Sequence, residues 1–557
     1  MTSGAESPFR SPTAYRLTLL VALGVYGVLT VAASRTHLDR INPDAVSYLR
    51  HALYLTEGRL YDSISGYWSP VLSWCTAPLM AAGMEGLHAA RVVLAMWGVV
   101  LIVAAYAVIR RWTSLPAGLA MVALVLVAET TVRWATTVFP DIIMAACLMG
   151  YCAVLLRADF AERRSLQVLC GVWAGVAFLG KAYALPFFVV HFPVSLALLY
   201  RLPPRVSEPG RGTTSVPRLS RVWMMGMVGF LTVSLPWIVA LSVKYRQPTF
   251  GLVGPINHAI IGPDFSPTHG LWSPVAGRVT QWEIPESRDY EFWSPLDSAA
   301  HFKHQVDYSW QTVKRIRTSL ARFDYLSLSL ALLAIAPFLM YALGRSRELV
   351  KSAWVVGTIA VFCSGYPFVY FTYRYTYPFL KPLFVVASFQ FAFVLGQRIR
   401  ETGPLSLPAR ELLRWALLLL LTLSFSAQIN LPFEPYTVME SGGTRFNDVT
   451  VDSRPHRELA ARLGGASGRG PIASTLYWAG IYVGYYADRP FLGSPDCRTV
   501  EACNVELRGR DVGTFLVDRR WELADEFRYR SGWTLEMTVE PVPGEVVDVY
   551  TPSSSTR

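Results

Sequence analysis

Charged side chains are scarce in this sequence. Only 16% of its 557 residues are Asp, Glu, Lys or Arg, whereas a soluble globular domain carries roughly 25%. At the same time 52% of the residues are hydrophobic, and the mean hydropathy is +0.32. These proportions argue against an ordinary cytosolic enzyme and indicate a chain that lies largely within a membrane.

Cysteine is also scarce, and the common metal and nucleotide motifs are missing. Most of the seven cysteines lie in apolar segments, where we expect inert core residues. Cys497 and Cys503 lie close together in a more polar region, and an oxidising compartment would permit a disulfide there; the sequence leaves this pairing open. No zinc-type Cys/His spacing, Walker loop or dinucleotide-binding glycine motif occurs.

The positive charge of the chain is unevenly distributed. Residues 430–557 contain 14 Lys and Arg against 18 Asp and Glu, whereas residues 1–429 contain 37 against 22. All of the net charge of +11 therefore arises in the apolar part. A nucleic-acid-binding protein would carry its basic patch on a polar face, so we expect membrane lipids and no nucleic acid as partners.

Apolar runs of about 17–25 residues predict membrane-spanning helices, because that length crosses the ~30 Å hydrocarbon core. The predicted fold class is an all-α polytopic membrane protein with about 11 transmembrane helices in residues 1–429, followed by a small α/β domain in residues 430–557. The runs lie at 15–33, 89–109, 115–133, 141–157, 166–180, 184–200, 222–243, 325–343, 353–370, 377–395 and 412–428.

The distribution of Lys and Arg among the connecting segments predicts the orientation. With eleven spans, the segments rich in these residues lie on the same side as the N-terminus, which the positive-inside rule assigns to the cytoplasm. If 70–86 also spanned the membrane, every later segment would change sides, so we expect an interfacial helix there. The prediction is a multi-pass protein of the inner (plasma) membrane with a cytoplasmic N-terminus.

Three substantial pieces are then predicted outside the cytoplasm: a first outer loop at 34–88, a larger loop at 244–318 and the C-terminal domain. The domain alternates strand-like with helix-like segments, which is typical of an α/β fold. The strand-like segments are Ile472–Thr475, Thr514–Val517, Thr534–Val539 and Val546–Tyr550, and the helix-like ones are Tyr477–Ala487 and Trp521–Phe527.

Two carboxylates are predicted at the outer membrane edge. Asp44 follows Asn42 and Pro43, which suit the start of a helix, and Asp141 follows Pro140 at the start of the fourth span. Either acid could simply complement a helix dipole. However, ionisable groups at this depth are costly and tend to be functional, and two such carboxylates could form one site in which one acts as general base.

Two cations stand out among the short outer connections, which are otherwise poor in positive charge. Lys181 lies at the outer end of the fifth span, and Arg374 lies between the ninth and tenth spans. Their side chains could extend to the lipid headgroups. The functional interpretation is that they hold an anionic substrate group such as phosphate, which Arg can bind with two parallel hydrogen bonds.

The loop 244–318 is rich in aromatic side chains, among them Trp282. Aromatic residues at a bilayer surface usually form an interfacial belt, and they also stack on sugar rings. Nearby in the first loop, we expect His51 to be a hydrogen-bonded surface residue rather than a base.

Six short motifs together carry a family resemblance; they are Asp44-x-x-x-Tyr48, Gly66-Tyr67-Trp68-Ser69-Pro70, Gly86…Arg91, Phe139-Pro140-Asp141, Gly180-Lys181 and Tyr373-Arg374-Tyr375…Pro378. With them the chain resembles the GT-C type membrane glycosyltransferases that use polyprenyl-phosphate sugars, which include the protein O-mannosyltransferase-like enzymes and the aminoarabinose transferases of lipid A. The mannosyltransferase branch often has Glu directly after the first-loop Asp, and Ala45 at this place favours the broader bacterial group.

The resemblance implies an inverting transfer of a sugar from a polyprenyl-phosphate donor to a lipid, glycan or protein acceptor. Asp44 would be the general base and Asp141 would orient the acceptor, while the cations stabilise the departing phosphate. The predicted substrate-binding residues are Tyr48, Lys181, Tyr373, Arg374 and Trp282.

Other functions stay open from the sequence alone. A transporter or flippase of lipid-linked saccharides would also span the membrane many times, although such proteins often show internal repeats. A saccharide polymerase or ligase would place its key groups in the loop 244–318, and an interaction protein would act through residues 430–557. No cofactor is certain, and the sequence leaves open whether a divalent metal ion lies between Asp44 and Asp141.

Overall fold

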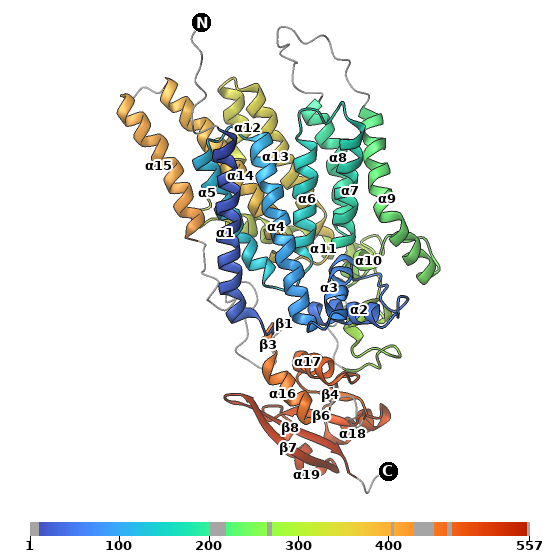
Figure 1. Cartoon of the computed structure of the whole chain (residues 1–557). Coiled ribbons are helices and arrows are strands. Elements are labelled where there is room, and N and C mark those ends of the chain that lie inside the picture. Colours follow the sequence, from blue (N-terminus) through green and yellow to red (C-terminus); the bar gives the residue numbers. More distant parts are fainter. Residues whose placement is uncertain are drawn as a thin grey trace.

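The computed structural model describes residues 11–200, 219–263, 270–402, 406–427, 450–464 and 470–553. It contains a large bundle of helices and a smaller domain that includes a β-sheet, joined end to end (Figure 1). The predicted domain boundary at 429/430 lies outside the described residues. We call the end of the bundle next to the sheet-containing domain the domain end.

Each of the eleven predicted runs coincides with a helix of the bundle. Six of these helices, α1, α4, α5, α9, α13 and α14, are long and apolar enough to cross a membrane. The bounds of the eleven are α1 (Pro12–His37), α4 (Gly86–Trp112), α5 (Ala117–Ala135), α6 (Asp141–Leu155), α7 (Arg164–Gly180), α8 (Ala184–Tyr200), α9 (Leu219–Tyr245), α12 (Leu328–Ala342), α13 (Ser346–Ser364), α14 (Tyr377–Thr402) and α15 (Leu407–Ser426).

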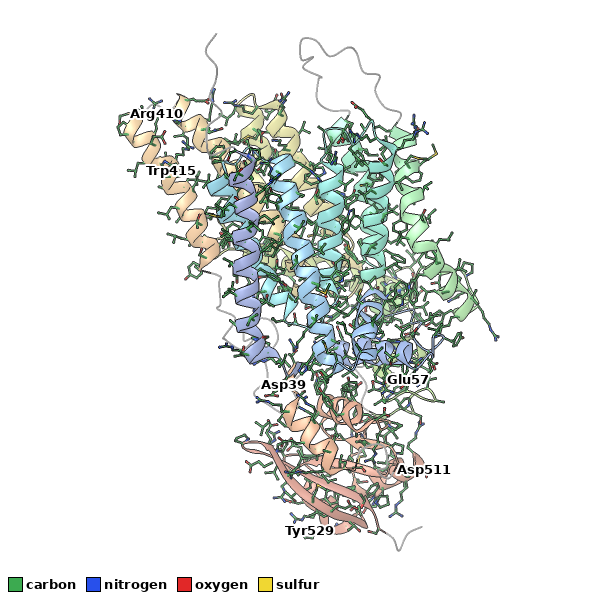
Figure 2. The ribbon with its side chains drawn as sticks, in the orientation of Figure 1. Asp39, Glu57, Arg410, Trp415, Asp511 and Tyr529 are labelled. Atoms are coloured by element: carbon green, nitrogen blue, oxygen red, sulfur yellow. A yellow bond between two sulfur atoms is a disulfide. The ribbon has the colours of Figure 1, made fainter. Side chains whose placement is uncertain are left out.

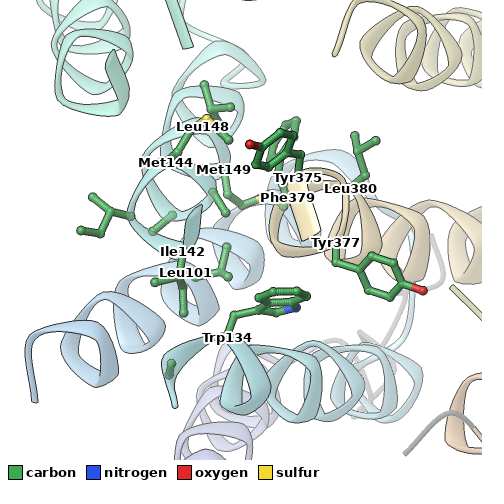
Figure 3. Packing of buried hydrophobic residues seen from close by; sticks show 14 of the residues in the cluster. Leu101, Trp134, Ile142, Met144, Leu148, Met149, Tyr375, Tyr377, Phe379 and Leu380 are labelled. Carbon is green, nitrogen blue, oxygen red and sulfur yellow. The ribbon is translucent and has the colours of Figure 1, made fainter. Parts of the chain in front are cut away.

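Helices α6 and α14 form the centre of the bundle. All fifteen residues of α6 are buried, and 89% of the most apolar window of α14 is buried, against 22% for α1. Figure 3 shows side chains of α6, such as Met144 and Met149, in one cluster with Phe379 and Leu380 of α14. Burial on all sides explains why these helices are apolar all round.

Short helices cover the domain end. Helix α3 has 11 residues and spans only about 17 Å, so it is too short to cross the bilayer, in agreement with the interfacial helix predicted at 70–86. In the loop 244–318 the sequence analysis missed α11, a 23-residue helix. The other elements here are α2 (Pro43–Thr56), α3 (Val71–Ala81), α10 (Val253–Ala259), η2 (Gln281–Glu283), η3 (Pro285–Ser287), α11 (Ala299–Ala321), η4 (Tyr366–Phe368) and η5 (Tyr373–Tyr375).

The C-terminal domain is built on a four-stranded mixed sheet with strand order β4-β6-β8-β7. Strands β4 and β6 run parallel, and β8 pairs antiparallel with both β6 and β7. A disulfide joins Cys497 to Cys503, the pairing that the sequence left open. The elements are α16 (Arg454–Arg462), β4 (Ile472–Ser474), α17 (Tyr477–Ala487), α18 (Val500–Gly509), β6 (Thr514–Asp518), α19 (Ala524–Arg530), β7 (Trp533–Val542) and β8 (Glu545–Pro552).

Two short strand pairs attach this domain to loops at the domain end of the bundle. Strand β1 (Arg40–Ile41) pairs antiparallel with β3 (Val451–Asp452), and β2 (Gly270–Leu271) pairs antiparallel with β5 (Gly493–Ser494). Figure 2 shows Asp39 at this junction and Arg410 at the opposite end of the bundle. The domain is therefore hydrogen-bonded to the loop that carries Asp44.

Candidate active site at the domain end of the bundle

Asp44 is held in the first turn of α2. The side chain of Asn42 accepts a hydrogen bond from the backbone N–H of Ala45 at 2.9 Å, and Pro43 occupies the first helical position. The Asp44 carboxylate accepts a hydrogen bond from Arg374 Nη2 at 2.7 Å, across 330 positions of sequence. Asp44 therefore does more than complement the dipole of its own helix, because it forms an ion pair with a residue of η5.

Asp141 opens α6 and is 1% exposed. One of its oxygens forms an ion pair with Lys181, which directly follows α7. The other oxygen, Oδ2, has no hydrogen-bond partner among the residues that the structure describes. A buried carboxylate oxygen of this kind is an available acceptor, because leaving it unpaired is costly.

Gly180 explains how Lys181 comes so close to Asp141. A Cβ atom on Gly180 would lie 2.9 Å from Cγ2 of Ile143 in the first turn of α6. That distance is shorter than side chains tolerate, so only glycine allows the end of α7 to approach α6 this closely. The Gly-Lys motif thus places the ammonium group beside the carboxylate.

Tyr375 brings the two ion pairs together. Its ring centroid lies 3.9 Å from Lys181 Nζ and 5.5 Å from Arg374 Cζ, and Arg374 also lies over the ring of Phe139 at 3.9 Å. The cations of the two pairs therefore share one aromatic surface, which is a favourable cation–π arrangement. We call Asp44, Asp141, Lys181 and Arg374 the paired site.

Tyr48 lies in the protein interior beside the paired site. Its ring packs edge-on against Trp68 with centroids 5.2 Å apart. Burial, and then the charges of Asp44 and Asp141, hold the pKa of the Tyr48 hydroxyl well above its usual value, so the hydroxyl keeps its proton at physiological pH.

Trp282 contacts Trp68, the neighbour of Tyr48, with ring centroids 6.4 Å apart. Its backbone oxygen accepts hydrogen bonds from Ser47 at 2.9 Å and from the indole of Trp68 at 3.0 Å. Its own indole contacts Trp478 of the C-terminal domain, with centroids 6.4 Å apart. Trp282 therefore connects α2 to the domain.

Tyr373 contacts a different group from its neighbours in η5. The Arg322 guanidinium lies 5.8 Å from the centre of its ring, whereas Arg374 and Tyr375 contact the acids or their partners. The structure thus brings Asp44, Asp141, Lys181 and Arg374 together and leaves Tyr373 to one side.

The sequence predicts His51 as a hydrogen-bonded surface residue, but the structure buries it. Its Nε2 lies 3.0 Å from the backbone oxygen of Glu283. Burial, with the charge of Arg278, lowers the pKa of His51 to about 3. The ring is therefore neutral at physiological pH.

Glu283 is the centre of a buried polar network that the sequence analysis did not identify. Its carboxylate accepts hydrogen bonds from the Tyr54 hydroxyl at 2.5 Å and from two backbone N–H groups, and it forms ion pairs with Arg50 and Arg278. Arg50 in turn donates to Asp488 of the C-terminal domain at 2.7 Å. The network fixes α2, and with it Asp44, to the second loop and the domain.

Two further charged residues, Glu129 of α5 and Lys381 of α14, lie inside apolar runs and were not among the predicted site residues. The signal was present, since an ionisable residue inside an apolar run is itself a functional indicator.

A divalent metal would have to displace existing partners at the paired site. Each carboxylate already forms an ion pair with a cation. Across the described ranges, no group of three His, Cys, Asp or Glu side chains is arranged to hold a metal ion. The available donors thus do not favour a metal between Asp44 and Asp141.

Comparison with known proteins gives one family match. Residues 68–210 match the family model described as dolichyl-phosphate-mannose-protein mannosyltransferase. This segment contains Asp141 and Lys181 but neither Asp44 nor Arg374. Comparison with curated protein sequences gives no significant match.

The whole chain resembles a solved membrane protein. ArnT from Cupriavidus metallidurans bound to undecaprenyl phosphate is similar, with a TM-score of 0.54 and 16% identity over 98% of this chain and 99% of that chain. Its apo state gives a TM-score of 0.51 and 18% identity over 97% and 98%. The two proteins share a fold over their full lengths, and the predicted resemblance to the GT-C membrane glycosyltransferases is confirmed.

Proposed function

We propose that this chain is an inverting glycosyltransferase that moves a sugar from a polyprenyl-phosphate donor to an acceptor at the domain end of the bundle. The observation that carries the proposal is the paired site, where two carboxylates and two cations from four separate elements meet beside a membrane bundle. The GT-C fold and the family match over residues 68–210 support the same class of chemistry.

The cations would bind the phosphate of the donor. Arg374 and Lys181 present positive charge at one end of helices that lie in the membrane, where the phosphate of a lipid-linked sugar would be found. The planar guanidinium of Arg374 can bind a phosphate through two parallel hydrogen bonds, while the ammonium group of Lys181 acts as a point charge. In the resting protein these charges are neutralised by Asp44 and Asp141, so an incoming phosphate replaces a carboxylate.

This replacement prepares Asp44 for catalysis. Once the donor phosphate occupies Arg374, the Asp44 carboxylate is released from its ion pair and can accept the proton of the acceptor hydroxyl or amine. A positioned general base of this kind typically contributes 10²–10⁴-fold to the rate. Oδ2 of Asp141, which has no hydrogen-bond partner among the described residues, would accept a hydrogen bond from the acceptor and orient it.

The reaction is a single displacement at the anomeric carbon. The acceptor oxygen or nitrogen forms a bond to this carbon on the face opposite the phosphate while the bond from the carbon to the phosphate oxygen breaks. The electron pair of the broken bond leaves on the phosphate, and the proton of the acceptor passes to Asp44. Arg374 and Lys181 stabilise the negative charge that develops on the phosphate, and the anomeric configuration inverts.

The location of the titratable groups separates this proposal from its rivals. A polymerase or ligase would have its key groups in the loop 244–318, yet Glu283 of that loop accepts hydrogen bonds from Tyr54 and from two backbone N–H groups and forms ion pairs with Arg50 and Arg278, which fixes α2. We also propose that the N-terminus lies on the cytoplasmic side of the membrane and that the C-terminal domain lies on the opposite side. The acceptor is a lipid, a glycan or a protein.

Asp44→Asn tests the proposal. The variant keeps the shape of the side chain but removes the base, so transfer from a polyprenyl-phosphate sugar should fall about a hundredfold or more. Asp39→Asn is the matched control, because Asp39 pairs with Arg457 at the junction and lies outside the site; its transfer rate should stay near that of the wild type. Undiminished transfer by correctly folded Asp44→Asn would refute the mechanism.

A further inference from the structure

Arg91 is a buried cation near the start of α4, and its guanidinium contacts two separate segments of the chain. The residue is 8% exposed. Its Nη1 donates a hydrogen bond to the backbone oxygen of Thr136, and its Nη2 donates to the backbone oxygen of Arg40. These oxygens belong to the two segments that lead into the carboxylates of the paired site, because Asp44 follows Arg40 and Asp141 follows Thr136 within five positions.

The two oxygens are suitable partners for a buried cation. Thr136 caps the C-terminus of α5, where the last backbone oxygens of a helix have no partner within that helix and where the helix dipole favours positive charge. Arg40 lies in β1, which pairs with β3 next to the C-terminal domain. One guanidinium therefore joins the end of α5 to the strand that precedes α2.

Asn42 bridges the same two segments. Its side-chain oxygen accepts a hydrogen bond from the backbone N–H of Ala45 at 2.9 Å, which caps α2. Its Nδ2 donates to the backbone oxygen of Val138 at 3.5 Å, a long and therefore weak hydrogen bond. Asn42 thus ties the first turn of α2, which carries Asp44, to the segment after α5, and Arg91 is the stronger of the two bridges.

The guanidinium is a rigid spacer between these segments. It is planar, so the directions of its N–H groups are fixed relative to one another. Oxygens bound to Nη1 and Nη2 of one group are therefore held at a fixed separation. The cations of the paired site come from other elements, Arg374 from η5 and Lys181 from the end of α7. Arg91 thus acts on the carboxylates of the site and not on its cations.

We propose that Arg91 is a positioning residue that sets the separation of Asp44 and Asp141. This inference rests on the proposed function, in which one carboxylate takes the proton of the acceptor and the other orients the acceptor. Such a reaction is sensitive to geometry, since a misplacement of about 1 Å can slow it about 10²-fold. Binding of the donor phosphate, which the cations perform, does not depend on this separation.

Arg91→Lys tests the inference, because lysine keeps the charge but cannot reproduce two fixed N–H directions. The kcat of transfer and the Kd for a polyprenyl phosphate are measured on the purified full-length protein. The kcat should fall about tenfold or more while the Kd stays within about twofold of the wild-type value. An unchanged kcat would overturn the inference. A parallel loss of kcat and donor affinity would also overturn it, because Arg91 would then support the site as a whole.

Arg111→Lys is the matched control. Arg111 lies at the opposite end of α4, and its Nη1 donates to the backbone oxygen of Ala153 in α6. The variant therefore removes the same kind of hydrogen bond from the same helix, far from the carboxylates, and its kcat and Kd should stay near those of the wild type. An equal fall of kcat in both lysine variants would contradict the inference, because a general loosening of α4 would explain it.

Asn42→Ser keeps the inference testable if Arg91→Lys does not fold. Serine is also a favourable N-cap, so α2 keeps its first turn, whereas the hydrogen bond to Val138 is lost. The kcat should fall a few-fold with the donor Kd unchanged, and a kcat equal to that of the wild type would contradict the claim that these bridges set the separation of the acids.

Asp44→Asn in the same assay separates this inference from the proposed function. Undiminished transfer by Asp44→Asn would refute the proposed function, and the inference with it. A strongly impaired Asp44→Asn beside a fully active Arg91→Lys would overturn the inference alone.

Discussion

The paired site and the Glu283 network lie at the same end of the bundle but differ in how completely their carboxylates are satisfied. Glu283 accepts hydrogen bonds from the Tyr54 hydroxyl and from two backbone N–H groups, and it forms ion pairs with Arg50 and Arg278. At the paired site each carboxylate forms an ion pair with one cation, and Asp141 Oδ2 has no hydrogen-bond partner in the part of the chain that the structure describes.

This difference bears on what each cluster can do. A carboxylate that accepts several hydrogen bonds holds the elements around it in place, as Glu283 does for α2. A carboxylate held by one cation can exchange that cation for another partner, which suits the chemical step proposed for Asp44.

The largest expected effect is a loss of donor affinity at the paired site. Arg374→Gln removes a charge-assisted hydrogen bond worth about 1.5–3 kcal/mol, so the affinity for a polyprenyl phosphate should fall by roughly 10- to 100-fold. Lys303→Met removes an exposed lysine of α11 that pairs with Asp307, and it should leave that affinity unchanged. Titration of both variants with the same polyprenyl phosphate measures the difference, and equal affinities of the two variants would contradict the role of Arg374.

A smaller effect is expected from the approach of α7 to α6. Gly180→Ala introduces a methyl group 2.9 Å from Ile143, and such overpacking typically costs about 1–3 kcal/mol of stability. Transfer should fall several-fold as Lys181 moves away from Asp141.

Gly118→Ala is the matched control for that variant, because a Cβ atom on this α5 glycine meets nothing within 4 Å. Thermal unfolding and transfer assays on the two variants give the comparison. If both alanine variants behaved alike, the close approach at Gly180 would not be what positions Lys181.

Much of the fold was predictable because hydropathy is a local property. A run of apolar residues long enough to cross a bilayer predicts a helix without knowledge of its neighbours, and each predicted run coincides with a helix. The strands and helices predicted in residues 430–557 correspond to β4, β6, β7, β8, α17 and α19 for the same reason.

The four residues of the paired site were candidates from the sequence, but their pairing could not be predicted from it. Predicted depth in the membrane and the sign of the side-chain charge identified the candidates Asp44, Asp141, Lys181 and Arg374. Nothing in the sequence indicates which of the two acids forms an ion pair with which cation. Asp44 and Arg374 are 330 positions apart, and such a contact depends on the packing of the whole bundle. The Glu283 network and the strand pairs between the loops and the C-terminal domain also join residues that are far apart in the sequence, so they could not be predicted from local patterns.

The central claim is that Asp44 exchanges its cation for the donor phosphate, and donor binding by Asp44→Asn tests it most directly. Loss of the carboxylate removes the group that competes with the phosphate for Arg374, so the variant should bind a polyprenyl phosphate at least as tightly as the wild type while its transfer rate falls about a hundredfold or more. If the donor affinity of Asp44→Asn fell to that of Arg374→Gln, the account would be contradicted. Asp44 would then contribute to donor binding instead of being displaced from Arg374 by the donor phosphate.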